Sequence, residues 1–295
     1  MAMRTLPHRV PPFPVEYLGG CFRRLHFCLV EMSALSDKRA MRLVLKIAKP
    51  VFDYALPERC PSCGEISTDG TNFCAKCWPH IRFLNPPWCE SCALPFDYEQ
   101  PEGARCATCL ADPPIHDGIR AAVAYDGTTR KIALRLKYGG RIGLAKLIAR
   151  HLVRHLPADR TGMIVVPVPL HWTRLWSRSF NQSALIAQEL ARLGGLVYAP
   201  DVLLRIKRTP SLRGLSGKER RKAVARVFRT NPAKAHVLSG ARVILVDDVL
   251  TTGATSDGCI KTLKKSGANW VQLFCWARAL RDNGHTPPHF EAGDA

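Results

Sequence analysis

The sequence predicts an α/β domain with a mainly parallel sheet, preceded by a small cysteine-rich module. Three observations support this prediction. Apolar runs alternate with amphipathic stretches from residue 119 onward, four CxxC pairs lie between residues 60 and 109, and a Thr/Gly turn joins an acidic strand end to a helix. Strands that alternate with helices are typical of parallel sheets, because each crossover places a helix on a face of the sheet.

The chain of 295 residues is long enough for more than one domain. Its beginning shows no clear period, and Met32 is an alternative start. A serine followed by apolar residues at helical spacing then predicts a helix with a kink at Pro50. The expected order is an irregular extension over 1–35, a linker helix over 36–56, the cysteine-rich module over 57–112, the α/β domain over 113–282 and a solvated tail over 283–295.

Within the α/β domain, each element is predicted from its period and its flanking residues. Short runs of β-favouring apolar residues predict buried strands, and apolar residues three and four apart predict helices. Gly194 and Gly195 mark a helix end. The expected strands are 119–126, 163–169, 241–249 and 270–279, and the expected helices are 131–138, 143–156, 182–195 and 256–268.

Charge and hydropathy restrict the partners and the compartment. The chain has 43 Lys and Arg against 24 Asp and Glu, a formal net charge of +19, which predicts attraction to phosphate-bearing partners. The chain has no uncharged stretch long enough to predict a transmembrane segment, and its proline-rich beginning is unlike a signal peptide. A cytoplasmic protein with reduced thiols is therefore expected.

The four CxxC pairs predict two structural zinc ions. A CxxC turn directs two thiolates at one ion, and two such turns complete a tetrahedral site with no position left for water. A sequential pairing is the simplest and an interleaved one stays open, while redox-active dithiols are the alternative to zinc. The expected ligands are Cys60, Cys63, Cys74 and Cys77 for one ion and Cys89, Cys92, Cys106 and Cys109 for the other.

The segment 243–255, VILVDDVLTTGAT, predicts a ligand site. Open α/β sheets bind ligands at the carboxyl ends of their strands, where Asp247 and Asp248 lie. The following backbone N–H groups, with the hydroxyls of three threonines and the start of a helix, can enclose a phosphate. Two carboxylates would repel a bare phosphate, so ribose hydroxyls or hydrated Mg²⁺ are expected on the same ligand.

These residues resemble the 5-phosphoribosyl-1-pyrophosphate (PRPP) motif of type I phosphoribosyltransferases, and the whole layout resembles the ComF/GntX family. The resemblance covers about residues 53 to 280. It includes the double zinc ribbon, LKYGGR at 136–141, VPVPLHWTRLWSRSFNQ at 166–182 and the PRPP motif, in family order.

The resemblance implies a type I phosphoribosyltransferase-like fold and a role for each motif. Asp247 and Asp248 are expected to contact the ribose, with Mg²⁺ accompanying PRPP, and the segment 166–172 to bind pyrophosphate. Arg174 and Arg178 offset its charge, and Asn181 and Gln182 either contact the ligand or cap a helix. The expected PRPP-binding residues are Thr251, Thr252, Gly253, Ala254, Thr255, Val168, Pro169, Arg174, Arg178, Asn181, Gln182 and Lys137.

The chain departs from the family pattern at several positions near this site. Ser179 replaces the glycine of RGFNQ, and the family's Thr-x-x-Gln and Arg-Asn positions read Thr209 to Leu212 and Arg221 to Ala223. Catalysis is therefore a weaker expectation than PRPP binding. Asp247 and Asp248 are the expected catalytic residues. In a catalysed reaction they stabilise the ribose while a nucleophile attacks C1′ and pyrophosphate departs, and Mg²⁺ with the basic residues stabilises the leaving pyrophosphate.

Between Arg205 and Lys234 the chain is strongly basic, with Glu219 as the single acid. One-signed charge favours contact with phosphates, either those of the ligand or those of a nucleic acid. Trp172, Trp176 and Phe180 are candidates for stacking on bases. The family resemblance to DNA-uptake factors adds single-stranded DNA and a helicase-like competence partner as expectations.

Two functions follow from the sequence. The first is a ComF-type protein that binds PRPP with Mg²⁺ and acts in DNA uptake during natural transformation. The alternative is an active PRPP-dependent phosphoribosyltransferase of nucleotide or amine metabolism, unrelated to competence. Pyrophosphate release with an acceptor separates the enzyme from the binding module.

Overall fold

The computed structural model describes residues 59–67, 73–207 and 227–280. Every described residue belongs to one compact unit, within residues 58–295. The expected N-terminal extension, the linker helix with Pro50 and the C-terminal tail lie outside the described residues.

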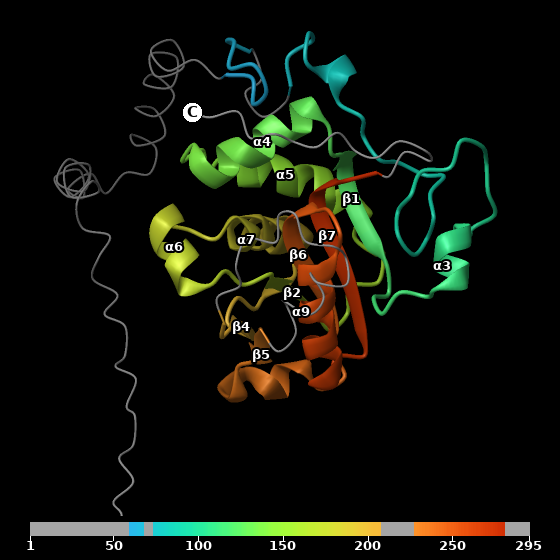
Figure 1. Ribbon diagram of the computed structural model, residues 1–295, viewed down its shortest axis with the longest axis vertical. Helices are drawn as coiled ribbons and strands as arrows, with labels where there is room; N and C mark the ends of the chain where they lie inside the picture. Colours follow the sequence, from blue (N-terminus) through green and yellow to red (C-terminus); the bar gives the residue numbers. More distant parts are fainter. Residues whose placement is uncertain (1–58, 68–72, 208–226, 281–295) are drawn as a thin grey trace, which may run out of the picture. The chain divides into compact units, whose positions relative to one another are not determined.

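A five-stranded sheet forms the centre of the described unit, with the order β1-β7-β6-β2-β3. All of its strand pairs are parallel, which confirms the predicted α/β class. β6 and β7 are the longest strands, and their buried apolar runs occupy the middle of the sheet (Figure 1). The strands are β1 (Ile119–Ala124), β2 (Met163–Pro167), β3 (Val197–Tyr198), β6 (Arg242–Leu250) and β7 (Trp270–Arg278).

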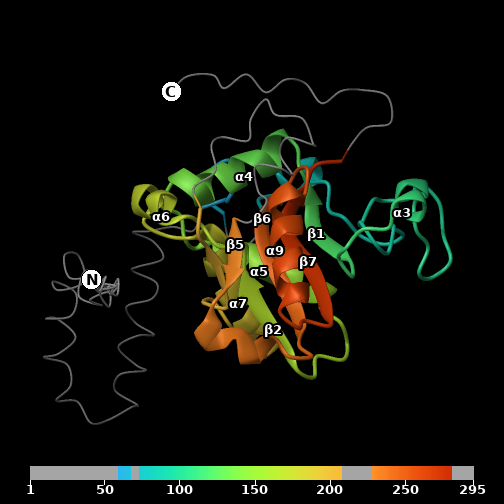
Figure 2. The same cartoon turned by 60° about the horizontal axis from the view of Figure 1, so that its bottom comes forward.

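Helices cover both faces of the sheet (Figure 2). Successive residues of β6 alternate between two buried clusters, Val243 and Leu245 in one and Ile244 and Val246 in the other. Helices α4 (Gly127–Tyr138), α5 (Leu144–Leu152) and α7 (Gln182–Gly194) contribute to the cluster of Ile244, and α9 (Ala254–Lys265) to that of Val243. This is the arrangement that a parallel sheet with crossover helices requires.

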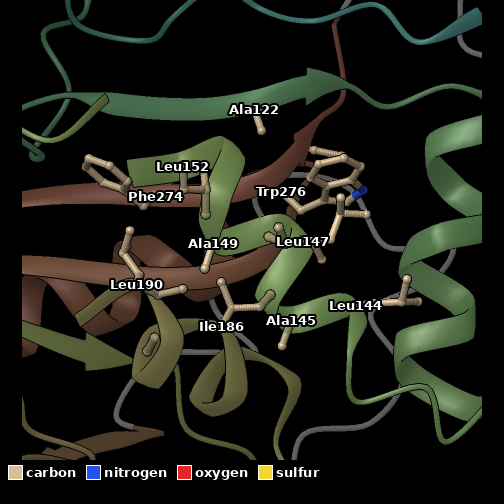
Figure 3. Packing of buried hydrophobic residues seen from close by; sticks show 14 of the residues in the cluster. Ala122, Leu144, Ala145, Leu147, Ala149, Leu152, Ile186, Leu190, Phe274 and Trp276 are labelled. Carbon is tan, nitrogen blue, oxygen red and sulfur yellow. The ribbon is translucent and has the colours of Figure 1, made fainter. Parts of the chain in front are cut away.

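The larger cluster joins β7 to two helices (Figure 3). Phe274 and Trp276 of β7 are fully buried, and they share the cluster with Leu152 of α5 and Ile186 and Leu190 of α7. The Trp276 indole donates a hydrogen bond to the carbonyl of Thr129, at 3.4 Å. The indole N–H is therefore satisfied inside the apolar core.

The cysteine-rich segment packs directly against the sheet edge. Phe83 forms an antiparallel bridge with Val123 of β1, and Leu84 N–H donates to the Ala122 carbonyl at 3.0 Å. Further along, Ile119 N–H donates to the Ser91 carbonyl at 2.9 Å. These hydrogen bonds satisfy part of the outer edge of β1, and they place the two regions in one compact unit.

Some elements differ from the predictions. α6 (Trp172–Arg178) was not predicted, because seven residues are too few for a helical period to be read. β4 (Leu203–Arg205) and β5 (Phe228–Thr230) form a separate antiparallel pair that was not predicted, since three-residue strands carry too little pattern. β6 runs one residue further than predicted, to Leu250, and α9 begins two residues earlier than predicted, at Ala254. Among the described helices, none has the length and hydropathy needed to cross a bilayer.

Candidate functional site

The cysteines form two four-sulfur clusters, paired sequentially. Within each cluster the sulfur atoms lie within 4.8 Å of one another. Sulfurs at the corners of a tetrahedral zinc site are about 3.8 Å apart, because each Zn–S bond is about 2.3 Å, and Cys63–Cys74 and Cys92–Cys106 lie at 3.7 and 3.8 Å. The donors fit zinc. The clusters are Cys60, Cys63, Cys74 and Cys77, and Cys89, Cys92, Cys106 and Cys109.

Backbone donors favour the thiolate form in each cluster. Burial acts against the thiolate of Cys60, but N–H groups that include that of Cys74, 3.4 Å away, lower its pKa to about 6. Burial acts in the same way on Cys89, and the Cys106 N–H at 3.2 Å helps to lower its pKa to about 7. Two Cys₄ clusters with such donors are consistent with two structural zinc ions.

Asp247 and Asp248 lie in the last part of β6, on the sheet's carboxyl edge. In register they fall beyond the apolar core residues of the strand, and Asp247 pairs with Cys275 of β7. The Asp247 carboxylate accepts a hydrogen bond from Ser183 Oγ at 3.1 Å, and from the Asp248 N–H at 2.9 Å. Ser183 is in the first turn of α7, so a side chain at the N-terminus of this helix holds the carboxylate beside the strand end.

Lys137 of α4 neutralises the second carboxylate. Its Nζ lies 2.8 Å from Asp248 Oδ2. Burial would lower the pKa of Lys137, but Asp248 and then Asp247 outweigh that effect and raise it. Burial, with the adjacent Asp248 charge, raises the pKa of Asp247 to about 7 despite Lys137 and Ser183. The acidic pair therefore has a lysine counter-ion at Asp248, and a carboxyl at Asp247 that titrates near neutral pH.

The predicted phosphate loop follows the acids without interruption. Thr251 and Thr252 are exposed, Gly253 has a φ of +75°, and α9 begins at Ala254. A left-handed φ of this kind strongly favours glycine. The loop thus turns sharply into the amino end of a helix whose first N–H groups and dipole can receive an anion. Thr255 lies in the first turn of that helix, half-buried.

The expected pyrophosphate segment lies on the neighbouring strand. Val168 directly follows β2, and its N–H donates to the Val246 carbonyl at 2.9 Å, so it lies beside β6 just before the acids. Pro169 continues this segment. Arg174 and Arg178 are not on the loop itself but on α6, and Arg178 donates to the Tyr138 hydroxyl at 2.9 Å while covering its ring. The charge of Arg178 nevertheless acts on Lys137.

Asn181 has a structural role. Its Oδ1 accepts from the Ser183 N–H at 3.1 Å, capping α7, and its Nδ2 donates to the Val168 carbonyl at 3.0 Å. It therefore ties the pyrophosphate segment to the helix that holds Asp247. Gln182 is 2% exposed, and its Nε2 has no hydrogen-bond partner within the described part of the chain.

Three residues join this site that the sequence analysis did not select. Ser183 contacts Asp247, and Tyr138 contacts Arg178. Arg205 of β4 is partly buried. Burial and the charge of Arg174 lower its pKa, although Asp247, among other groups, acts in the opposite direction. Arg205 was counted only as part of the basic segment, because nothing in its local sequence indicates which strand end it faces. Most of that segment, residues 208–226, lies outside the described residues.

Comparison with known proteins first identifies the zinc-binding region. Residues 51–110 match the double zinc ribbon domain family. This agrees with the two Cys₄ clusters and with the fold prediction of a zinc ribbon ahead of a mainly parallel α/β sheet.

Among solved structures, the allosteric regulatory enzyme of purine biosynthesis matches 48% of this chain and 30% of its own, at 21% identity and a TM-score of 0.32. The chain thus spans less than a third of that protein. An adenine phosphoribosyltransferase from Leishmania donovani matches 72% of this chain and 86% of its own, at 12% identity and a TM-score of 0.30.

Curated relatives match over most of the chain. "Competence protein F" of Haemophilus influenzae is 30% identical over 228 residues, which are 75% of this chain and 97% of that protein. "Competence protein ComFC" of Streptococcus pneumoniae is 30% identical over 215 residues, 72% of this chain and 90% of its own. "DNA utilization protein YhgH" of Escherichia coli K12 is 30% identical over 198 residues, which are 65% of this chain and 84% of that protein. The chain belongs to the competence protein F (ComF) family.

Proposed function

We propose that this ComF-family protein binds PRPP together with Mg²⁺ at the carboxyl end of β6. Asp247 and Asp248 bind the ribose hydroxyls, and the loop from Thr251 to Thr255 holds the 5′-phosphate. Mg²⁺ prefers carboxylate and phosphate oxygens, and both would be present here once PRPP is bound. The segment of Val168 and Pro169, with the nearby arginines, faces the pyrophosphate.

One observation carries this proposal. A buried acidic pair with its own lysine counter-ion leads directly into a threonine loop and the start of a helix. The carboxylates suit hydroxyl donors, and the helix start suits a phosphate. A ligand with only one of these groups would leave half of the site unused, whereas a sugar phosphate uses both.

Calorimetric titration tests the site without knowledge of an acceptor. The zinc-loaded full chain is titrated with PRPP in excess Mg²⁺, beside the Asp247→Ala/Asp248→Ala double variant and Asp201→Ala, whose carboxylate is exposed and outside the site. Wild type and Asp201→Ala are expected to bind, and the double variant to lose binding at least about tenfold. Absence of heat with wild type would refute the proposal.

Catalysis is the alternative use of the same site. An active phosphoribosyltransferase of nucleotide or amine metabolism would release pyrophosphate when an acceptor attacks the ribose C1′. A pyrophosphate assay with bases, amines and single-stranded DNA distinguishes the two functions. Binding without release under all acceptors supports the binding module, and release with one acceptor supports the enzyme.

A nucleic-acid surface is favoured by a second observation. Trp172, Trp176 and Tyr138 are 64%, 81% and 68% exposed, and Arg174 and Arg178 lie on the same short helix as the tryptophans. No acidic residue occurs between Gly127 and Pro157. Exposed rings among arginines are what sequence-tolerant binding of single-stranded nucleic acid requires.

We therefore place the protein in DNA uptake, in the reducing cytoplasm where zinc thiolates persist, alongside a helicase-like partner. Binding of single-stranded DNA is expected to weaken with salt, and about tenfold in Trp176→Ala. Neutralising Arg220, Arg221 and Lys222 tests the basic segment. Val197→Ala, an exposed apolar change on β3, serves as the control. Equal affinity in all variants would contradict this part of the proposal.

A further inference from the structure

Each zinc ribbon is fixed to the α/β domain by an arginine that donates into a CxxC turn. The Arg135 guanidinium donates to the carbonyls of Pro61 and Ser62, at 2.8 and 2.5 Å, and these residues lie between Cys60 and Cys63. In the second ribbon, the Arg278 guanidinium donates to the Cys92 carbonyl, itself part of a zinc-ligand residue.

Both arginines belong to elements that also carry the candidate ligand site. Arg135 is in the last turn of α4, where Lys137 reaches Asp248. Arg278 ends β7 and pairs in register with Leu250, the residue immediately before the threonine loop. The next residue, Ala279, donates its N–H to the Leu250 carbonyl at 2.9 Å.

The two ribbons also belong to different buried clusters. Cys60 and Phe73 of the first ribbon share a buried cluster with Leu136 of α4. Ala93 of the second ribbon shares the opposite cluster with Leu250. The first ribbon therefore shares its buried cluster with the helix of Lys137, and the second with the residue that precedes the threonine loop.

From this arrangement we infer that the two zinc ribbons brace the ligand site through Arg135 and Arg278, which act as positioning residues, so that zinc retention and PRPP binding stabilise each other. This inference rests on the proposed function. When zinc leaves, the CxxC turns lose the geometry that presents their carbonyls, and two charged donors lose their acceptors. Coupling between two sites is reciprocal in binding free energy, so bound PRPP must also raise the affinity of the chain for zinc.

Arg120 provides a matched control. It also holds the second CxxC turn, donating to the Glu90 carbonyl at 3.0 Å and pairing with the Glu90 carboxylate. However, it lies near the amino end of β1, level with Phe274 of β7 and not with Arg278. A loss of Arg120 therefore loosens the same ribbon without touching the strand end that leads into the loop.

The experiment measures two quantities on the zinc-loaded full chain, for wild type, Arg135→Gln, Arg278→Gln and Arg120→Gln. The first is PRPP affinity by calorimetry in excess Mg²⁺. The second is the affinity for zinc, from equilibrium competition with a zinc-selective chelator, in the presence of PRPP and of ATP as the control polyphosphate. Zinc content and circular dichroism establish that each variant is folded and loaded, and Arg278→Lys replaces Arg278→Gln should that variant not fold.

In wild type, PRPP but not ATP is expected to raise the affinity for zinc about fivefold or more. Arg135→Gln and Arg278→Gln are expected to weaken PRPP binding to a similar degree and to lose this gain in zinc affinity. Arg120→Gln keeps both within about twofold. PRPP that binds wild type without raising its affinity for zinc, or arginine variants that all behave like Arg120→Gln, would overturn the inference. No binding to wild type instead refutes the proposed function and removes the coupling with it.

Discussion

Lys137 Nζ lies 2.8 Å from Asp248 Oδ2, which joins the last turn of α4 to the carboxyl end of β6. The side chains are 23% and 13% exposed, so this ion pair is only weakly screened by solvent. Lys137 thus supplies the protein's own cation beside the two adjacent carboxylates of the candidate ligand site. The first prediction follows from this contact.

Lys137→Met is expected to destabilise the ligand-free protein by about 1–2 kcal/mol at pH 8, because the two carboxylates lose their counter-ion. Chemical denaturation of the zinc-loaded protein measures the change. Lys131→Met, at an exposed position of the same helix, is the control and should alter stability by less than about 0.5 kcal/mol. Equal effects of both substitutions would contradict the role of the ion pair.

Asp247→Asn is expected to stabilise the ligand-free protein, and more so at higher pH. The pKa of Asp247 is raised from 3.8 to about 7, so the folded state binds this proton more tightly than the unfolded state. Wild-type stability therefore falls as pH rises from about 4 to 7, and this loss is absent in the variant. The stability difference should be about 1 kcal/mol larger at pH 8 than at pH 6, measured by urea unfolding. A difference that does not change with pH would contradict the assignment.

Ser179→Gly is expected to stabilise the protein by about 0.5–1 kcal/mol. Ser179 ends α6 with a φ of +64°, a conformation that costs an L-residue free energy and glycine almost none. This also gives a physical reason for the glycine that the family pattern has at this position. Ser177→Gly, inside α6, should have the opposite sign, because glycine weakens a helix interior. Thermal unfolding of the two variants measures both changes in stability.

Gly253→Ala is expected to cost about 1–2 kcal/mol of stability and to weaken PRPP binding, because alanine resists the φ of +75° at the start of α9. There is space for the added methyl group, whose nearest neighbour is 3.7 Å away, so the effect reports backbone conformation and not a clash. Gly127→Ala at the start of α4, where φ is not positive and no atom lies within 4 Å, is the control. Calorimetry and unfolding should leave that variant unchanged or slightly stabilised.

Metal analysis of the purified chain is expected to give two zinc ions per chain. Cys63→Ser or Cys106→Ser should each remove about one, since each cluster needs all four of its sulfurs to complete a tetrahedral site. Cys275→Ala, at a buried cysteine outside both clusters, should retain both ions. A folded protein without metal, whose dithiols titrate with thiol reagents, would instead support a redox function.

Much of the fold follows from local pattern. The runs in β2, β6 and β7 and the amphipathic stretches of α4, α5 and α7 were predicted to within a few residues, because each is long enough for its period to be read. The short β4–β5 pair and α6 were not, because three-residue strands and a seven-residue helix are too short for a period to be read. Asn181 was open between ligand contact and cap, and only its two hydrogen bonds show that it caps α7.

By itself the sequence determined the fold class and the local motifs. The CxxC spacing identified the eight clustered cysteines, and the order of acids, threonines and glycine after an apolar strand predicted a candidate ligand site, because these signals lie within a few residues of one another. Only the tertiary structure decided the long-range pairings: which cysteines share a cluster, that Lys137 neutralises Asp248, and that Arg135 and Arg278 join the ribbons to the site. Such contacts depend on how separate elements pack, and the residues involved are too far apart in the chain for any local period to record them.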